Sequence, residues 1–332
     1  MLKTALVIVS VLAVAIVAAF AFGPREPADL TVRIDREAIA ANPVAFLAQS
    51  EAQVSDIRPG MEKEVIYAFP ASRAKTPWAI VYLHGFSATK NELRPVPDRV
   101  AARLGANLYY ARLAGHGQDG AAMGQATVND WVNDLAEALE IADEIGERTV
   151  VIGTSTGATL AALAATEPDL REQVDAIVQV SPNYALKNRA ARVLDFPFAE
   201  TIVQWVEGEE RSFEPVNELH AQNWTSRYPS RAVLPMAALM REVRGRTFEN
   251  IAVPTLFIFD EEDTVVDHTA TRRVAARWGQ ATGAAAHIEL LHGTDDPYRH
   301  VIAGESLSPS TTEAAIDLIA GWIEGLDAPP SS

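Results

Sequence analysis

The segment that most constrains this chain is the pentapeptide Gly153-Thr154-Ser155-Thr156-Gly157. It follows an apolar run at 149–152 and precedes an Ala- and Leu-rich run at 158–165, so the pattern predicts a buried strand, a tight turn and a helix. Glycines two residues on either side of Ser155 leave room where larger side chains would collide with the strand and helix. The turn would hold Ser155 at strained backbone angles and project its hydroxyl outward. It would also direct the Thr156 N–H, at the start of the helix, toward any oxyanion formed on that hydroxyl.

Taken alone, this pentapeptide is also compatible with an ordinary strand-to-helix turn whose serine caps the helix. A phosphate-cradling loop is excluded, because the Gly-Lys-Ser/Thr ending that such a loop needs is absent. The surrounding sequence therefore has to decide between a structural and a chemical role for Ser155.

A second strand-and-turn signal lies upstream. Residues 79–83 read as a buried strand that runs into His84-Gly85-Phe86. With both motifs in place the chain resembles the α/β-hydrolase family, in which the G-x-S-x-G turn is a nucleophile elbow. The resemblance implies that the H-G-x turn supplies the second oxyanion N–H, at the position of Phe86. We expect His84 to brace the loop by hydrogen bonding rather than to react.

A third strand at 106–111 leads into a Gly-rich loop at 112–117 that contains Gly115-His116-Gly117. This segment resembles the carboxylesterase and monoacylglycerol-lipase-like branch of the family, where a G-H-G loop commonly lies beside the pocket. For His116, a loop-bracing role is favoured over a catalytic one.

The acid of a serine-based triad is expected after the serine, since the family order is Ser, then Asp or Glu, then His. Residues 254–259 read as a buried strand that runs into the acidic segment 260–267. The family's G-x-x-D-x-x-V pattern places Asp263 in the catalytic position and puts Asp260 where glycine is usual. That departure keeps Asp260 as an alternative acid. Asp263 is favoured, because the following Val265-Val266 can pack against the core and hold its carboxylate rigidly.

Three late histidines are candidates for the base. His287 lies inside the apparent last strand at 286–291, where it is a face residue of the sheet. His292 follows that strand directly, and His300 begins an H-V-I segment ahead of a terminal helix expected from Thr311. The resemblance favours His300, because family members place the catalytic histidine in the loop after the last strand, commonly as H-V or H-V-I. His292 stays the alternative base.

Other chemistries are disfavoured. One possible metal site would use His292, Asp295, Asp296 and His300. These residues lack the H-E-x-x-H spacing, and Pro297 breaks any helix that could align them as ligands. No G-x-G-x-x-G fingerprint occurs in a strand-to-helix setting, so we expect neither a metal nor a nicotinamide or flavin cofactor. A net charge of −16 and scattered Lys and Arg residues argue against nucleic-acid binding. The absence of cysteine excludes disulfides and thiolate chemistry.

The N-terminal segment carries information on location. A short positive start at 1–4 precedes an apolar run at 5–22 that ends at Gly23-Pro24. Its length slightly favours an uncleaved signal anchor, but Ala19-Phe20-Ala21 also fits an A-x-A cleavage site, so residues 1–24 are predicted to be a signal anchor or a signal peptide. Either form would place the rest of the chain across the membrane. The protein would be membrane-anchored outside the cytoplasm in the first case and secreted or periplasmic in the second.

The remaining chain divides into a polar, Pro-containing lead-in at 25–60, with one helix expected at 43–50, and a single hydrolase domain at 61–325. Expected strands alternate with helical runs such as 128–145, which is the pattern of an α/β fold with a mostly parallel, doubly wound sheet. The expected strands lie at 65–69, 79–83, 107–111, 149–153, 176–180, 255–259 and 286–291.

An insertion at about 184–250 is richer in aromatic and charged residues than a simple crossover needs. The resemblance implies a helical cap inserted after strand 6 of the family's sheet, with an apolar lining that shapes the acyl pocket. The same residues could instead attach the cap to the core, and both roles stay open. They are Phe196, Phe198, Trp205, Trp224, Tyr228, Met236 and Met240.

Together the motifs imply a serine hydrolase that cleaves carboxylic esters through an acyl-enzyme, with Ser155 as nucleophile, His300 as base and Asp263 as the orienting acid. The amides of Phe86 and Thr156 would hold the oxyanion. The expected partner is a small-molecule ester or lipid substrate of moderate chain length. Two alternatives stay open: an acyltransferase that uses the same triad, and a non-catalytic, membrane-tethered binding protein that keeps only the fold.

Overall fold

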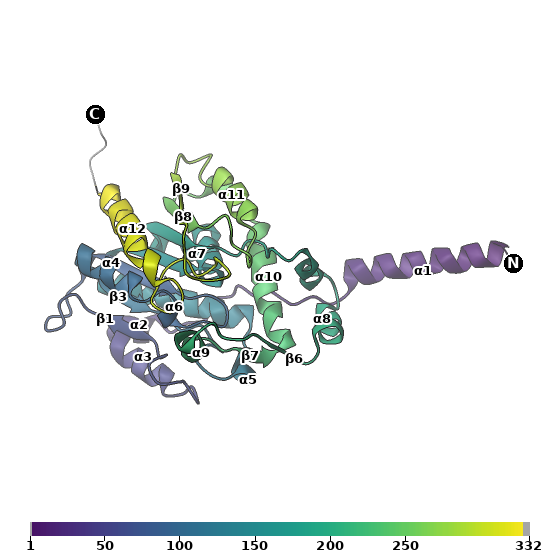
Figure 1. The fold of residues 1–332 in the computed structure, drawn as a ribbon, viewed down its shortest axis with the longest axis horizontal. Helices are drawn as coiled ribbons and strands as arrows, with labels where there is room; N and C mark the ends of the chain where they lie inside the picture. The colour runs from purple at the N-terminus through teal and green to yellow at the C-terminus, as the bar shows by residue number, and fades with distance from the viewer. Residues whose placement is uncertain (1, 328–332) are drawn as a thin grey trace.

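Within residues 2–327, the part of the chain that the computed structural model describes, the apolar runs form one seven-stranded sheet (Figure 1). Its strands are β1 (Glu64–Ile66), β2 (Thr76–Leu83), β3 (Asn107–Tyr110), β4 (Gly146–Thr154), β5 (Ala176–Val180), β8 (Thr255–Phe259) and β9 (Ala286–Leu290). They lie in the order β1-β3-β2-β4-β5-β8-β9, and every neighbouring pair is parallel except β1 with β3. The mostly parallel sheet predicted from the sequence is confirmed.

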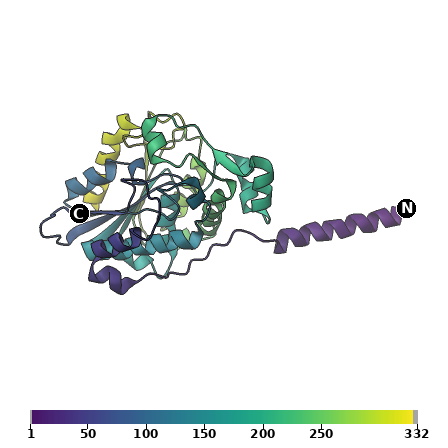
Figure 2. The same ribbon diagram turned by 90° about the horizontal axis from the view of Figure 1, so that it is seen from below.

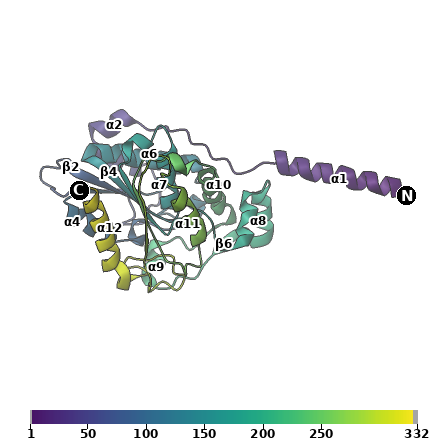
Figure 3. The same cartoon turned by 90° about the horizontal axis from the view of Figure 1, so that it is seen from above.

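Side chains alternate along the strands and bury both faces of the sheet. In β2, Ile80 and Tyr82 face one core, whereas Ala79 and Val81 face the other. The first core is covered by α4 (Val96–Leu104) and α12 (Thr312–Leu326). The second core is covered by α6 (Val128–Ile145), α7 (Thr156–Thr166), α10 (Val233–Arg244) and α11 (His268–Arg277). Figure 3 shows α4 and α12 on one side of the strands and α6 on the other, which is the doubly wound arrangement that parallel crossovers produce.

The predicted helices form with the caps that their sequences supply. α3 (Pro43–Glu51) begins after Asn42, whose side chain accepts a backbone hydrogen bond, and Pro43 occupies the first turn, where no N–H is needed. α6 begins at a capping box in which Thr127 and Asp130 each accept a hydrogen bond from the other's backbone N–H. Shorter helical turns connect the larger elements: η1 (Lys90–Glu92), α5 (Gly120–Met123), η2 (Arg171–Gln173), η5 (Phe248–Asn250) and η6 (Pro309–Thr311).

The lead-in at 25–60 lies along α6 before it reaches β1. Its extended first part is fixed where the Arg33 N–H donates to the side chain of Asn133. α2 (Arg36–Ala41) and α3 follow and pack on the domain surface. At the end of α3, a buried ion pair joins Glu51 to Arg112 at 2.7 Å, which ties the lead-in to the loop after β3.

α1 (Leu2–Phe22) extends away from the rest of the molecule (Figures 1 and 2). Its end contacts the insertion after β5: the rings of Phe20 and Phe196 pack edge-on with 5.1 Å between centroids, and the Phe198 N–H donates to the Pro24 carbonyl at 2.8 Å. Among the residues whose placement is described, no helix is long and apolar enough to cross a membrane. That residues 1–24 are a signal anchor or a signal peptide stays a prediction.

The insertion between β5 and β8 forms the cap. It contains η3 (Arg189–Asp195), α8 (Ala199–Glu207), β6 (Glu210–Ser212), α9 (Glu218–Asn223), β7 (Arg227–Pro229), η4 (Ser230–Ala232) and α10. Most of these elements are helical, but β6 and β7 pair as a short antiparallel ribbon that was not expected from the sequence. Three-residue strands are too short to show an alternating pattern. Figure 3 shows α8 and β6 at the end of the molecule from which α1 extends.

Candidate active site

The turn between β4 and α7 holds Ser155 at the strained angles that the pentapeptide predicts. Its φ is 52° and its ψ is −111°, a region that non-glycine residues rarely occupy. The flanking glycines have no room for a side chain. A Cβ on Gly153 would lie 2.5 Å from the carbonyl carbon of Gly157, and a Cβ on Gly157 would lie 2.1 Å from the carbonyl oxygen of Leu83. The two glycines therefore permit the sharp turn that places Ser155 at the wall of a cavity.

Loops at the carboxyl ends of β4, β8 and β9 bring a serine, an acid and a histidine together. His300 Nε2 lies 3.1 Å from Ser155 Oγ, and His300 Nδ1 lies 2.8 Å from Asp263 Oδ2. The imidazole is 12% exposed and the Asp263 side chain is fully buried. A base within hydrogen-bond reach of a hydroxyl, oriented by a carboxylate on its other nitrogen, is an arrangement that can activate a serine.

The backbone of the loop after β8 holds Asp263 in place. Its Oδ1 accepts hydrogen bonds from the N–H groups of Val265 at 2.7 Å and Val266 at 2.9 Å, which leaves Oδ2 for His300. A carboxylate fixed in this way can select one imidazole tautomer, which is what an orienting acid has to do.

The alternative acid and base form a separate pair. Asp260 Oδ1 lies 3.4 Å from His292 Nδ1 and also accepts a hydrogen bond from the Glu262 N–H at 2.9 Å. The His292 side chain is 58% exposed. Within residues 2–327, neither Asp260 nor His292 hydrogen-bonds to Ser155. The structure thus brings Asp263 and His300, and not the alternatives, to the serine.

A second buried carboxylate, Asp296, shapes the loop that carries His300. Its Oδ2 accepts hydrogen bonds from the N–H groups of His300 and Val301, both at 2.9 Å, and its Oδ1 accepts one from the Tyr298 N–H at 3.0 Å. Three backbone donors are therefore tied to one side chain. From the sequence, Asp296 was considered only as a metal ligand, and its role in the loop becomes visible only in the folded chain.

Nearby charge controls the protonation of the imidazole. Burial alone would lower the pKa of His300, but the charge and the hydrogen bond of Asp263, together with other nearby carboxylates, outweigh it, so the pKa lies above its ordinary value. The carboxylates of Glu92 and Asp296 act in the same direction. The site thereby favours the imidazolium that would form if Ser155 transferred its proton to His300.

The turn after β2 packs directly against the serine. A Cβ on Gly85 would lie 3.3 Å from the Cβ of Ser155. Within residues 2–327, neither the Phe86 N–H nor the Thr156 N–H donates a hydrogen bond to a protein acceptor. The two donors expected from the sequence are therefore available to a ligand, as stabilisation of a negatively charged oxygen requires.

Glu92, in η1, fixes the turn that carries Phe86, and this role was not apparent from the sequence. The residue is 2% exposed, and its Oε2 accepts hydrogen bonds from the Gly85 N–H at 2.7 Å and the Tyr82 hydroxyl at 3.0 Å. Burial raises the pKa of Glu92 to about 7, against the lowering effects of the Gly85 N–H and of the nearby His300. No spacing rule links such an acid to the turn, so sequence patterns give no signal for it.

His84 and His116 brace the neighbouring loops, in agreement with their expected roles. His84 Nε2 accepts a hydrogen bond from the Leu113 N–H at 3.1 Å, while its Nδ1 donates to the Gly85 carbonyl at 2.9 Å. The ring of His116 lies 5.0 Å from that of His84, and its Nδ1 lies 3.1 Å from the Ala114 carbonyl. Burial lowers the pKa of both imidazoles, to about 4 for His116. Both rings are therefore neutral near pH 7.

A cavity of about 660 Å³ lies over Ser155 between the sheet and the cap. Trp224 lines this catalytic cavity, whereas Trp205 is 84% exposed and lies outside it. The Phe86 ring packs edge-on against Tyr228 with 5.4 Å between centroids, which joins the turn after β2 to the cap. Apolar lining residues from the insertion are Leu186, Ala190, Ala191, Val193, Leu194, Ile202, Val203, Val206, Phe213, Trp224, Tyr228, Val233 and Met236.

The residues considered as metal ligands are engaged in other contacts. His292 pairs with Asp260, and Asp295 accepts a backbone hydrogen bond at 2.8 Å. Asp296 and His300 belong to the loop described above. Among the described residues, no group of three His, Cys, Asp or Glu side chains is placed to hold a metal ion.

Similarity to known proteins agrees with this fold. The family model described as "Serine aminopeptidase, S33" matches residues 74–294, more than half of the chain, a range that includes Ser155 and Asp263 and ends before His300. No curated protein sequence gives a match. A solved structure from work on two metagenome-derived lipolytic enzymes, LipS and LipT, is 19% identical, with a TM-score of 0.61 over 81% of this chain and 100% of that chain.

A soluble variant of the Saccharomyces cerevisiae monoglyceride lipase is 12% identical, with a TM-score of 0.60 over 81% of this chain and 92% of that one. The Paleococcus ferrophilus monoacylglycerol lipase is 16% identical, with a TM-score of 0.54 over 79% and 98%. At these identities the structures show a shared fold and no more. With the family match and the parallel sheet in agreement, the resemblance inferred from the motifs is confirmed, and the chain belongs to the serine aminopeptidase S33 family of α/β hydrolases.

Proposed function

We propose that this protein is a serine hydrolase that cleaves carboxylic esters. The observation that carries the proposal is the hydrogen-bonded chain from Ser155 through His300 to Asp263 at the base of a mainly apolar cavity. Serine-based hydrolysis needs a nucleophile, a base, an orienting acid and donors for the oxyanion. The distances from His300 to Ser155 and to Asp263 support the first three roles, and the N–H groups of Phe86 and Thr156 are the candidates for the fourth.

In the proposed mechanism, His300 Nε2 removes the proton from Ser155 Oγ as that oxygen attacks the ester carbonyl carbon. The N–H groups of Phe86 and Thr156 stabilise the negative charge that develops on the carbonyl oxygen. The imidazolium donates its proton to the departing alcohol oxygen, and the C–O bond breaks to leave an acyl group on Ser155. Water, deprotonated by the same imidazole, then attacks the acyl carbon and releases the acid, while Asp263 orients the imidazole throughout.

An ester with an apolar acyl chain fits the cavity best. The side chains that the cap contributes around Ser155 are aliphatic and aromatic, and burial of an apolar chain against them is favourable. The fold is shared with lipolytic enzymes and monoglyceride lipases, which supports the same class of substrate. Because an apolar pocket discriminates weakly per methylene, we expect a broad chain-length optimum rather than one preferred ester.

The name of the family suggests aminopeptidase activity as the alternative to ester hydrolysis. Such an enzyme needs a carboxylate that is available to bind the substrate's ammonium group. The carboxylates lining the cavity are Glu92, Glu207 and Asp296. Glu92 and Asp296 accept backbone hydrogen bonds, and Glu207 lies 3.4 Å from Arg211. Each of these described carboxylates already has a partner, so none is free to bind an ammonium group. The lining therefore favours ester substrates over peptides with a free N-terminus.

Hydrolysis of a p-nitrophenyl ester series from acetate to dodecanoate, with aminoacyl p-nitroanilides as the peptide-type comparison, tests the proposal. The protein should cleave esters of medium chain length far faster than the anilides. Ser155→Ala should stay folded and lose activity by about 10⁴-fold or more, since triad members act as a unit. Faster turnover of the anilides, or retention of more than about a tenth of the ester activity in Ser155→Ala, would contradict it.

The acyltransferase alternative uses the same residues and differs only in the acceptor. Chromatography of the products, with an added alcohol or amine at millimolar concentration, separates the two reactions. The free acid should dominate if water is the acceptor. A dominant new ester or amide would assign the protein as an acyltransferase.

We also propose that residues 1–24 direct the protein to or across a membrane without taking part in catalysis. The proposal is supported by the positive start and the apolar run at 5–22. A chain beginning at Arg25 should be soluble and active. Fractionation that finds the full-length protein only in the cytosol would refute the targeting role, and mass spectrometry of the N-terminus distinguishes a cleaved from a retained segment.

A further inference from the structure

A second cavity shares a wall with the catalytic cavity. It measures about 850 Å³ and is bounded by η3 with the residues that precede it, by α10 and by α11. Leu186, Asn188, Ala191 and Leu194 line both cavities, so a single layer of chain separates them. Neither Ser155 nor His300 lines this second space.

Charge distinguishes this second cavity, here called the basic cavity, from the chain as a whole. Six of its lining side chains are cationic and two are carboxylates, whereas the chain has 28 Lys and Arg residues against 44 Asp and Glu. The cationic residues are Lys187, Arg189, Arg192, Arg244, Arg273 and Arg277. They come from η3 and the chain just before it, from α10 and from α11, so they are far apart in the sequence. Folding gathers them into a local excess of positive charge.

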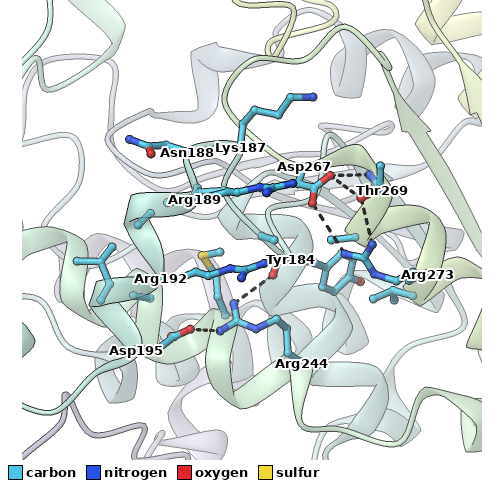
Figure 4. Close-up of a pocket in the computed structure, with 18 of the residues that line it drawn as sticks. Tyr184, Lys187, Asn188, Arg189, Arg192, Asp195, Arg244, Asp267, Thr269 and Arg273 are labelled. Carbon is cyan, nitrogen blue, oxygen red and sulfur yellow. Dashed lines mark hydrogen bonds and ion pairs between the residues drawn. The ribbon is translucent and has the colours of Figure 1, made fainter.

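Half of these cations lack an acidic partner. The three on α10 and α11 each have a carboxylate 2.7 to 3.8 Å away. Lys187, Arg189 and Arg192 have none within 4.0 Å among residues 2–327. Figure 4 shows Arg189 and Arg192 extending from η3 across the cavity toward the side that carries Arg273. Like charges gathered in this way repel one another, and an anion bound between them would relieve that repulsion.

Apolar side chains also line the basic cavity, and they are here called its floor. Tyr184, Leu194, Met240, Phe248 and Val274 line the cavity, and all five are buried. An inorganic anion would contact only the cationic side chains, and a neutral apolar molecule would contact only the floor. A volume of about 850 Å³ can hold a ligand that uses both.

We propose that the basic cavity binds an amphipathic anion, namely a carboxylate or a phosphate monoester joined to an apolar chain. The guanidinium groups of Arg189 and Arg192 hold the anionic head, because their N–H forks match the spacing of carboxylate and phosphate oxygens. The apolar chain lies on the floor beside Met240 and Phe248. This binding requires no catalytic step, so it can be tested independently of the proposed esterase activity.

Calorimetric titration of the full chain with octanoate and with octyl phosphate tests the proposal. At least one of the two should bind saturably, with an affinity that falls as salt is added, because charges near the surface are screened. Octanol and inorganic phosphate each carry only one part of the recognised chemistry and should bind at least about tenfold more weakly. The tighter of the two octyl anions identifies the head group.

Paired variants locate the binding. Arg189→Gln/Arg192→Gln should weaken binding of the preferred octyl anion by about tenfold or more, since both guanidinium forks are lost. Arg99→Gln/Arg103→Gln removes the same charge from α4 and should leave the affinity within about twofold. Lys187→Gln/Arg273→Gln gives a second test of the cavity if the first pair fails to fold.

Equal affinity in the cavity variants and the α4 variant would overturn the proposal, because the anion would then be bound elsewhere, including in the catalytic cavity. No saturable binding of either octyl anion would also overturn it. So would inorganic phosphate binding as tightly as octyl phosphate, because the apolar floor would then contribute nothing.

Discussion

The rim of the sheet and the cap above it hold their parts of the site in different ways. At the rim, backbone groups fix the side chains: two N–H groups hold Asp263 and three hold Asp296. The cap lines the cavity mainly with apolar side chains that pack by shape and area, and its hydrogen bonds go to the backbone of neighbouring loops, such as that from the Thr225 N–H to the Ser87 carbonyl at 2.8 Å. Directional contacts fix a position closely, whereas apolar packing tolerates change. Substitutions at the rim should therefore remove turnover, and substitutions in the cap should shift preference.

The largest effect is expected from the base. His300→Ala should lower kcat by about 10⁴-fold or more, because both proton transfers lose their carrier. His292→Ala is the matched control, since this exposed residue pairs with Asp260 and should stay within a few-fold of the parent. Steady-state kinetics on one p-nitrophenyl ester measures both. The reverse ranking would move the base to His292 and break the account of the rim.

The acid should come next. Asp263→Asn keeps the shape of the side chain but removes the charge that holds the imidazole in one tautomer, so kcat should fall by about 10³-fold or more. Asp260→Asn should be tolerated, because its partner is His292. Circular dichroism and kinetics on both variants provide the comparison. Equal losses would show that the two carboxylates act together.

A smaller effect, visible mainly in its pH dependence, is expected for Glu92. Activity should rise with pH as His300 loses its proton, with a midpoint above the ordinary histidine value of about 6.5. Glu92→Gln removes a negative charge that raises the pKa of His300, so the midpoint should move to lower pH. The pH profile of kcat/KM measures this shift. An unchanged midpoint would leave Glu92 with a purely structural role.

Glu92→Gln should also change how stability depends on pH. Burial raises the pKa of Glu92 from 4.5 to about 7, so the unfolded chain releases this proton at lower pH than the folded protein does. The contribution of Glu92 to stability is therefore full below pH 4.5 and is lost as the pH rises through about 7. The glutamine variant should lack that loss. Urea unfolding at pH 5 and pH 8 tests this, and an identical pH dependence in both proteins would contradict it.

The smallest effect on rate is expected in the cap. Trp224 lines the catalytic cavity and is 6% exposed, so Trp224→Ala should move the ester chain-length optimum and lower the thermal midpoint. Trp205 is 84% exposed and outside the cavity, so Trp205→Ala should change neither. A chain-length series and thermal unfolding of both variants measure the contrast. If Trp224→Ala alters neither property, selectivity is set elsewhere, most directly by the loops of Phe86 and His116.

Sequence patterns predicted the parts of the molecule that depend on local backbone geometry. The glycines around Ser155 predict a turn with no space for side chains, and the apolar runs predict the strands of the parallel sheet. The motif order then placed Asp263 and His300 ahead of Asp260 and His292, and the structure brings the favoured pair to the serine. Each of these motifs is a short run of consecutive residues, so it can be recognised from the sequence alone.

Features built from distant residues could not be predicted in this way. Glu92 and Asp296 act on backbone groups of other segments, and their carboxylates leave no pattern along the chain. The ribbon of β6 and β7 is too short to show a period. The basic cavity is assembled from η3, α10 and α11, and only tertiary packing reveals its charge.

The central claim is that Ser155 is a nucleophile activated by His300, and labelling with a fluorophosphonate tests it most directly. The reagent reacts with activated serines, and peptide mass spectrometry locates the adduct. We predict one adduct, on Ser155, that is absent from Ser155→Ala and forms far more slowly in His300→Ala. An adduct on another serine, no adduct on the folded protein, or equal labelling rates with and without His300 would contradict the account.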